Sequence, residues 1–176
     1  MLSFWWVRHA PVINNNNCCY GDNEVECDTS NKVDFINLVD SLPKNAQVFT
    51  STLSRAKEPF KASVKTGYKY DTYFEDPRLK EQNIGEYAGM KYAELYKLTK
   101  RIGVNSSYWL MEETHTPPKG ESFIQLNDRV TEFLNEKILN FNQGNIVLFS
   151  HGGPIRSAIN IALNNKNVRV GPFKID

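Results

Sequence analysis

The chain has few cysteines, no excess of charge of one sign and no long hydrophobic run. Its three cysteines, Cys18, Cys19 and Cys27, are an odd number without a C-x-x-C pair, which argues against a disulfide scaffold and against a zinc site. The 21 Lys and Arg nearly balance the 20 Asp and Glu, so the sequence lacks the basic field that nonspecific binding to nucleic acid or membranes requires. We therefore expect reduced thiols, no metal, no nucleic-acid partner and no membrane partner.

The apolar opening from Leu2 to Val7 is interrupted by Ser3 and followed by Arg8, which makes it too short for a signal sequence or a membrane span. We therefore expect a cytoplasmic protein. With 40% hydrophobic and 23% charged residues, the composition is that of an ordinary globular protein. A chain of 176 residues buries roughly 70% of the surface that its unfolded form exposes. We expect one domain over residues 1–176 that needs no structural metal, and the sequence leaves a homodimer open.

Short apolar runs alternate with helical patterns along the sequence. The predicted strands cover residues 2–7, 47–49, 71–74, 145–150 and 168–175, and the predicted helices cover residues 31–42, 54–66, 91–101, 123–138 and 154–163. Ser122 and Gln125 form a capping-box pattern before the fourth of these helices. Strands that alternate with helices predict an α/β fold, here a three-layer α/β/α sandwich with a mostly parallel central sheet.

Two finer predictions concern burial. The apolar run from Leu2 to Val7 is typical of a buried strand in a parallel sheet. The predicted helix at residues 31–42 has apolar residues at positions that suit one buried face, namely Val33, Ile36, Leu38, Val39 and Leu42.

Cationic and imidazole side chains follow three of the predicted strands. Arg8 and His9 follow the first strand, Arg55 comes shortly after the second, and His151 directly follows the strand at 145–150. Because the carboxyl ends of parallel strands share one edge of a sheet, these residues can converge although they are far apart in sequence. Such a cluster repels itself unless an anion binds to it, and the forked donors of arginine match phosphate oxygens. The sequence therefore predicts an oxyanion site.

Five segments, in this order, resemble the motifs of one known family. They are Arg8-His9-Ala10, Ser51-Thr52-Leu53-Ser54-Arg55-Ala56, the acidic loop from Leu79 to Gly89, Gly120-Glu121-Ser122 and Ser150-His151-Gly152-Gly153. The family that they resemble is the histidine phosphatase (phosphoglycerate-mutase-like) superfamily, and the resemblance covers most of the chain. It implies a phosphoglycerate-mutase-like fold and a single histidine phosphatase domain over residues 1–176.

The resemblance implies phosphomonoester hydrolysis through a phosphohistidine, without a cofactor or a metal. His9 would attack phosphorus in its neutral form. Like charge on Arg8, Arg55 and His151 should lower its pKa and so favour that form. The phosphate-binding groups by this interpretation are Arg8, Arg55, His151 and the backbone amides of Gly152 and Gly153.

The roles of the other candidates are less sharply defined. By the same resemblance, Glu81 is the general acid that protonates the leaving alkoxide and later accepts a proton from the attacking water. Glu121 is interpreted either as a supporting or pocket carboxylate or as a helix-start acid stabilised by the helix dipole. Ser51 is a candidate for substrate contact, although hydroxyls at helix starts usually serve as caps. Tyr92 and Tyr96 are expected in the core or in a pocket lid.

The sequence departs from the mutases of this family near its start. Ala10 stands where the family usually has glycine, and Pro11 follows where the mutases frequently have a Glu-Thr pair. An Arg-His-x-Pro opening followed by a Tyr-Gly segment is similar to the phosphatase branch that includes alpha-ribazole phosphatase. We expect a hydrolase of a small phosphorylated metabolite, with alpha-ribazole phosphate as one candidate. The alternatives are a phosphoglycerate-mutase-type phosphotransferase and a catalytically silent phospho-ligand binding module.

Overall fold

Four parallel strands form the centre of the structure, a computed structural model that describes residues 1–14, 16–106 and 110–163. These strands are β1 (Leu2–Arg8), β2 (Ala46–Thr50), β3 (Tyr70–Glu75) and β4 (Gly144–Ser150). The order across the sheet is β1-β4-β2-β3, and each described pairing is parallel. The predicted α/β fold with its parallel sheet is confirmed, while the strand predicted at 168–175 lies outside the described residues.

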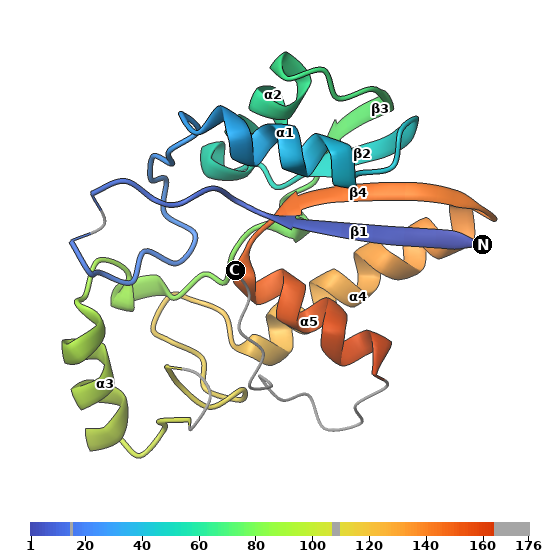
Figure 1. The fold of residues 1–176 in the computed structure, drawn as a ribbon. Helices are drawn as coiled ribbons and strands as arrows, with labels where there is room; N and C mark the ends of the chain where they lie inside the picture. Colours follow the sequence, from blue (N-terminus) through green and yellow to red (C-terminus); the bar gives the residue numbers. More distant parts are fainter. Residues whose placement is uncertain (15, 107–109, 164–176) are drawn as a thin grey trace.

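Helices cover both faces of this sheet (Figure 1). One face carries α1 (Lys32–Ser41) and α2 (Ser54–Lys65), and the other carries α4 (Phe123–Asn140) and α5 (Gly152–Ala162). The connection between β3 and α4 contains two short 3-10 turns, η1 (Pro77–Leu79) and η2 (Gly85–Tyr87), and helix α3 (Tyr92–Arg101). Figure 1 shows α3 beyond the carboxyl ends of the strands. None of the described helices is long and apolar enough to cross a membrane.

Strand β4 divides the hydrophobic core because its side chains alternate between the two faces of the sheet. Ile146 and Leu148 pack in the cluster beneath α4 and α5, whereas Val147 and Phe149 pack in the cluster beneath α1 and α2. All four side chains are buried. A strand that is covered on both faces accounts for the continuous apolar run in this part of the sequence.

The structure corrects both predictions about burial. Strand β1 pairs only with β4 among the described residues, and Trp5 is 41% exposed, with its indole N–H donating to Asn145 Oδ1. An aromatic-rich run in a parallel strand therefore does not require that every one of its side chains is buried. Leu42 is buried and Leu38 and Val39 pack against the same cluster, as predicted, but Val33 and Ile36 are largely exposed, and the buried side chain within α1 is Phe35. In α1, the burial of one large aromatic side chain outweighs the burial of two smaller aliphatic ones.

The predicted start of α4 is confirmed. The Gln125 N–H donates to Ser122 Oγ at 3.1 Å, and the Ser122 N–H donates to Gln125 Oε1 at 2.8 Å. The reciprocal pair satisfies two donors that a helix start otherwise leaves unpaired. Helix α4 therefore begins at a defined residue beside the Gly120-Glu121 segment.

Leu148→Ala should lower the free energy of unfolding by about 2–5 kcal/mol, because it removes fully buried methyl groups and leaves a cavity. The matched control is Leu139→Ala in α4, where the side chain is 82% exposed and the change should stay within about 0.5 kcal/mol. Urea unfolding followed by circular dichroism measures both values, and equal losses would contradict the core described above.

Candidate active site

The pairing of β1 with β4 brings two histidines together. Its register places Arg8 opposite Ser150, and the His9 N–H donates to the Ser150 carbonyl at 3.0 Å. His9 and His151 therefore leave adjacent strands side by side, with ring centroids 5.2 Å apart. Both side chains are buried. The structure thus brings together the two imidazoles that the sequence places at strand ends.

The ring of His9 is held in one tautomer. Its Nδ1 lies 2.8 Å from the carbonyl oxygen of Ala10. Because a carbonyl oxygen can only accept, Nδ1 carries the proton and Nε2 keeps its lone pair. Nε2 is therefore the ring atom that can act as a nucleophile.

Burial keeps both imidazoles neutral. Burial is the main reason why the pKa of His9 falls from 6.5 to about 4. The hydrogen bond to Ala10 raises this pKa, and the charges of Arg55 and Arg8 lower it to a smaller extent. Burial, followed by the charges of Arg55 and His9, also lowers the pKa of His151 well below 6.5. The sequence analysis attributes this effect to neighbouring cations. Their repulsion is present, but desolvation is the larger cause.

Arg55 lies fully buried in the first turn of α2. Its Nη1 donates to the Asn23 carbonyl at 2.6 Å, its Nη2 donates to the Gly21 carbonyl at 2.7 Å, and its guanidinium carbon lies 4.9 Å from the centre of the Tyr20 ring. Gly21 has a φ of +48°, and a Cβ there would meet the Ile84 side chain at 2.6 Å. Glycine therefore allows the loop that follows β1 to close over Arg55 and orient its guanidinium.

Three buried nitrogen atoms beside His9 have no hydrogen-bond partner among the described residues. They are Arg55 Nε and both ring nitrogens of His151. Buried polar groups are nearly always paired, because each unpaired one costs about 1–3 kcal/mol. A polar ligand would satisfy these atoms, and a guanidinium beside neutral imidazoles suits an anion.

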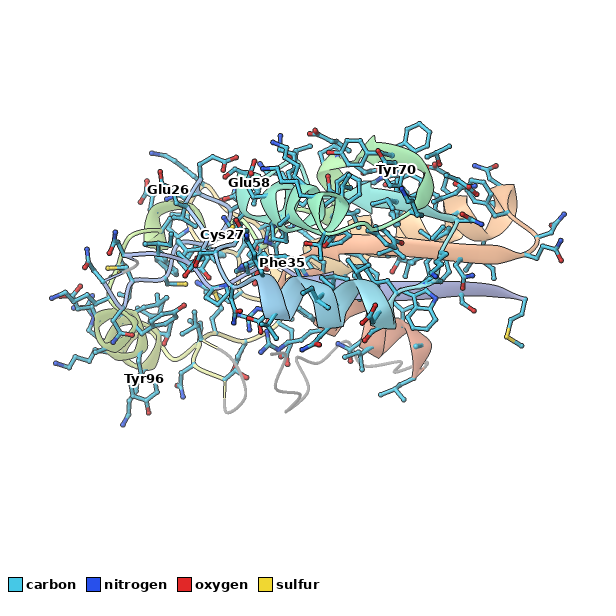
Figure 2. The ribbon with its side chains drawn as sticks, turned by 45° about the horizontal axis from the view of Figure 1, so that its top comes forward. Glu26, Cys27, Phe35, Glu58, Tyr70 and Tyr96 are labelled. Carbon is cyan, nitrogen blue, oxygen red and sulfur yellow. The ribbon has the colours of Figure 1, made fainter. Side chains whose placement is uncertain are left out.

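A pocket of about 470 Å³ is lined by Tyr20 and Gly21, which contact Arg55, whereas the buried His9, His151 and Arg55 are not among its lining residues. Three residues predicted for the site, Arg8, Glu81 and Gly152, contribute to its lining. Tyr92 and Tyr96, one helical turn apart on α3, form another part of the wall, and Figure 2 shows Tyr96 on that helix. The remaining lining residues are Cys19, Tyr20, Gly21, Gln82, Ile84, Ser106, Leu110 and Arg156. The pocket is therefore lined both by charged side chains and by aromatic and aliphatic ones.

Glu81 brings a carboxylate group to the start of α5. Its Oε1 accepts from the Gly153 N–H at 3.0 Å and from the Gln82 N–H at 2.9 Å. A Cβ on Gly153 would collide with this carboxylate, so glycine leaves the space that Glu81 occupies. This corrects the expectation that the Gly153 N–H faces a bound anion, because that donor serves Glu81. Gly152 remains on the pocket wall.

Glu121 and Ser51 do not line the pocket. Glu121 forms an ion pair with Arg129 at 2.6 Å and accepts from the Asn83 N–H at 3.0 Å. Ser51 Oγ accepts from the Leu53 N–H at 3.2 Å in the turn that leads into α2, as a serine hydroxyl in a turn does. Each residue therefore supports a neighbouring segment of the site instead of facing its pocket.

Three residues of this region were not predicted from the sequence. Tyr20 lies against Arg55, and its ring centroid is 6.5 Å from that of His9; the Tyr-Gly pair after the first strand is the available signal for it. Arg156 follows the start of α5 by one turn, so helical periodicity could have placed it toward the pocket. Nothing in the spacing of α4 marks Arg129, because its partners are backbone carbonyls of a distant segment.

The architecture places paired imidazoles and the Arg55 guanidinium at the carboxyl edge of a parallel sheet, where α/β proteins commonly bind ligands. The chain belongs to the histidine phosphatase superfamily (branch 1), whose family model matches residues 4–176.

Similar proteins are known from several organisms. The bifunctional protein Rv2228c of Mycobacterium tuberculosis is 28% identical over 89 residues, which are 51% of this chain and only 24% of that protein. A structure from Escherichia coli, described as an alpha-ribazole-5'-P phosphatase, aligns with a TM-score of 0.69 and 21% identity over 90% of this chain and 77% of that one. Mycobacterial glucosyl-3-phosphoglycerate phosphatase Rv2419c aligns with a TM-score of 0.71 and 19% identity over 94% and 79%. These structures share the fold of this chain.

An NMR titration of labelled imidazole rings should give His9 a midpoint of about 4 instead of 6.5, because burial and nearby cations disfavour its charged form. The same shift should lower the free energy of unfolding as the pH falls from about 6.5 to about 4, since only the unfolded chain takes up that proton in this window. In Arg55→Met the midpoint should rise. A wild-type midpoint near 6.5 would contradict the described burial.

Proposed function

We propose that this protein is a phosphomonoester hydrolase that works through a phosphohistidine on His9. The observation that carries the proposal is the buried set of nitrogens beside His9, namely those of His151 and Arg55 Nε, which no described residue hydrogen-bonds. One ring N–H of the neutral His151 and the Arg55 Nε–H can donate to the oxygens of a tetrahedral phosphoryl group, whose charge balances that of the guanidiniums. The membership in the histidine phosphatase superfamily supports the same reaction.

In the first step, the lone pair of His9 Nε2 forms a bond to phosphorus while the bond from phosphorus to the ester oxygen breaks. Arg8, Arg55 and His151 stabilise the charge on the three oxygens that do not react. The neutral state of His9, maintained by burial, keeps its lone pair available at neutral pH. The products of this step are a phosphohistidine and an alcohol.

Glu81 handles the proton in both steps. It protonates the departing ester oxygen, and in the second step it accepts a proton from the water that attacks the phosphohistidine and releases phosphate. Its position supports this role, because its carboxylate is held at the start of α5 and also lines the pocket.

The substrate in this proposal is a small phosphorylated metabolite whose alcohol half enters the pocket. A volume of about 470 Å³ admits a small molecule, and the walls formed by Tyr92, Tyr96 and Leu110 suit apolar or flat groups. Alpha-ribazole phosphate is the first compound to assay, since one structural neighbour is described as its phosphatase. Release of inorganic phosphate supports a hydrolase, exchange between two phosphorylated acceptors supports a phosphotransferase, and binding without turnover supports a silent module.

Turnover of a radiolabelled phosphomonoester, stopped with alkali, should leave the label on the wild-type protein. The quench must be alkaline because a phosphohistidine is stable in base and hydrolyses in acid. His9→Ala should lose the label and at least 10³-fold in turnover, because it removes the nucleophile. Addition of a metal chelator should leave the wild-type rate unchanged, since arginines supply the positive charge. Retained labelling in His9→Ala would rule out His9 as the phosphorylated residue.

Glu81→Gln should lower kcat/KM for an alkyl phosphate by about 10² or more, because an alkoxide needs a proton to leave. With 2,4-dinitrophenyl phosphate the loss should be smaller than about threefold, since that phenolate leaves without a proton. Glu86→Gln is the matched control, because Glu86 lies in the same connection but is exposed and paired with Lys119. Equal losses with both substrates in Glu81→Gln would count against a general acid.

A further inference from the structure

One arginine outside the pocket holds the backbone of the segment that carries Glu81. Arg129, in the second turn of α4, donates from Nη1 to the Arg78 carbonyl at 2.6 Å and from Nη2 to the Glu81 carbonyl at 3.1 Å. The two carbonyls belong to the two ends of a four-residue stretch. A single planar guanidinium therefore spans the stretch that ends in Glu81.

Glu121 orients this guanidinium. Its carboxylate accepts from Arg129 Nε at 3.0 Å and from Nη2 at 2.6 Å, which is the forked geometry that an arginine and a carboxylate prefer. Glu121 also accepts hydrogen bonds from the two residues that follow Glu81 in the chain. The Asn83 N–H donates to Glu121 Oε1 at 3.0 Å, and Gln82 Nε2 donates to the Glu121 carbonyl at 3.0 Å.

Besides ion pairs of Arg78 with Glu136 of α4 and of Lys80 with Asp22, the segment is attached to β4 and α5. Ser150 Oγ donates to the Leu79 carbonyl at 2.8 Å, directly before His151 in the chain. The Gly153 N–H donates to the Glu81 carboxylate at 3.0 Å. The part of the segment from Lys80 to Asn83 lies between η1 and η2, and these bonds tie the segment to the same two elements that position His151.

We propose that Arg129, braced by Glu121, is a positioning residue that sets the place of the Glu81 carboxylate relative to the ester oxygen. The proposal rests on the function proposed above and adds a residue to it. Arg129 itself does not line the pocket. It acts through two backbone carbonyls, so its removal should displace Glu81 without removing any donor to the phosphoryl group.

The expected defect is therefore selective for the leaving group. Displacement of a general acid by about 1 Å can cost about 10²-fold in rate. Such a loss should be seen only for substrates whose alcohol needs a proton. A purely structural role would instead lower the amount of active protein and reduce the rates of all substrates equally.

The experiment compares kcat/KM for an alkyl phosphate with kcat/KM for 2,4-dinitrophenyl phosphate in Arg129→Met and Glu121→Gln. We expect Arg129→Met to lower the first value about 30- to 100-fold and the second less than about threefold, and we expect a smaller loss of the same kind in Glu121→Gln. The double variant Arg129→Met/Glu81→Gln should be no slower with the alkyl phosphate than Glu81→Gln alone, because both changes remove the same function.

The matched control is Asn127→Ala on the same helix. Asn127 Oδ1 accepts from Ser157 Oγ at 2.9 Å, so this variant loosens the contact of α4 with α5 and leaves the bonds to the Glu81 segment in place. It should show equal changes with both substrates. Equal losses in Arg129→Met, or no loss, would overturn the positioning role while wild-type turnover still supports the proposed function. Absence of His9-dependent turnover of 2,4-dinitrophenyl phosphate by the wild type would overturn the proposed function, and the positioning role with it.

Discussion

The parallel pairing of β1 with β4 is the constraint on which the candidate site depends. Hydrogen bonds along these strands set Arg8 opposite Ser150. The residue that directly follows each of these strands is a histidine. A slip of one residue would move one ring away from the other and turn its side chain to the opposite face of the sheet. The burial of Val147 and Leu148 on opposite faces of β4 opposes such a slip, because each would have to exchange its apolar surroundings. Core packing and site geometry are therefore determined by the same register.

Burial has two effects at the site that act in the same direction. It removes water from His9 and His151, which favours their neutral forms, and it strengthens the attraction between Arg55 and an anion. Burial is unfavourable for the charged form of Arg55, because it also lowers the pKa of this guanidinium. Loop carbonyls and the face of Tyr20 partly compensate for that cost. A charged group is thus kept in a dry site by neutral dipoles, which leave its positive charge available.

The sequence predicted those parts of the molecule that depend on local pattern. Alternation of apolar runs and helical patterns is enough to predict the sheet, and the capping pair of Ser122 and Gln125 is a purely local signal. The convergence of His9 with His151 was also predictable, because both come directly after a strand. Contacts made across the fold were not. The bonds from Arg129 to carbonyls of a distant segment leave no trace in residue spacing, and the exposed face of α1 depends on how Phe35 meets the rest of the core.

The strand order has a consequence for how the molecule assembles. Strand β4 is the last of the described strands in the chain, yet it lies between β1 and β2. Until β4 inserts, β1 has no strand partner among the described residues, and Phe4 and Trp6 lack two members of the cluster against which they pack, Ile146 and Leu148 of β4. Closing a loop of that length is slow and leaves hydrophobic surface exposed in the meantime. A nascent or truncated chain without β4 therefore has His9 without His151, and the two imidazoles come together only once β4 has paired with β1.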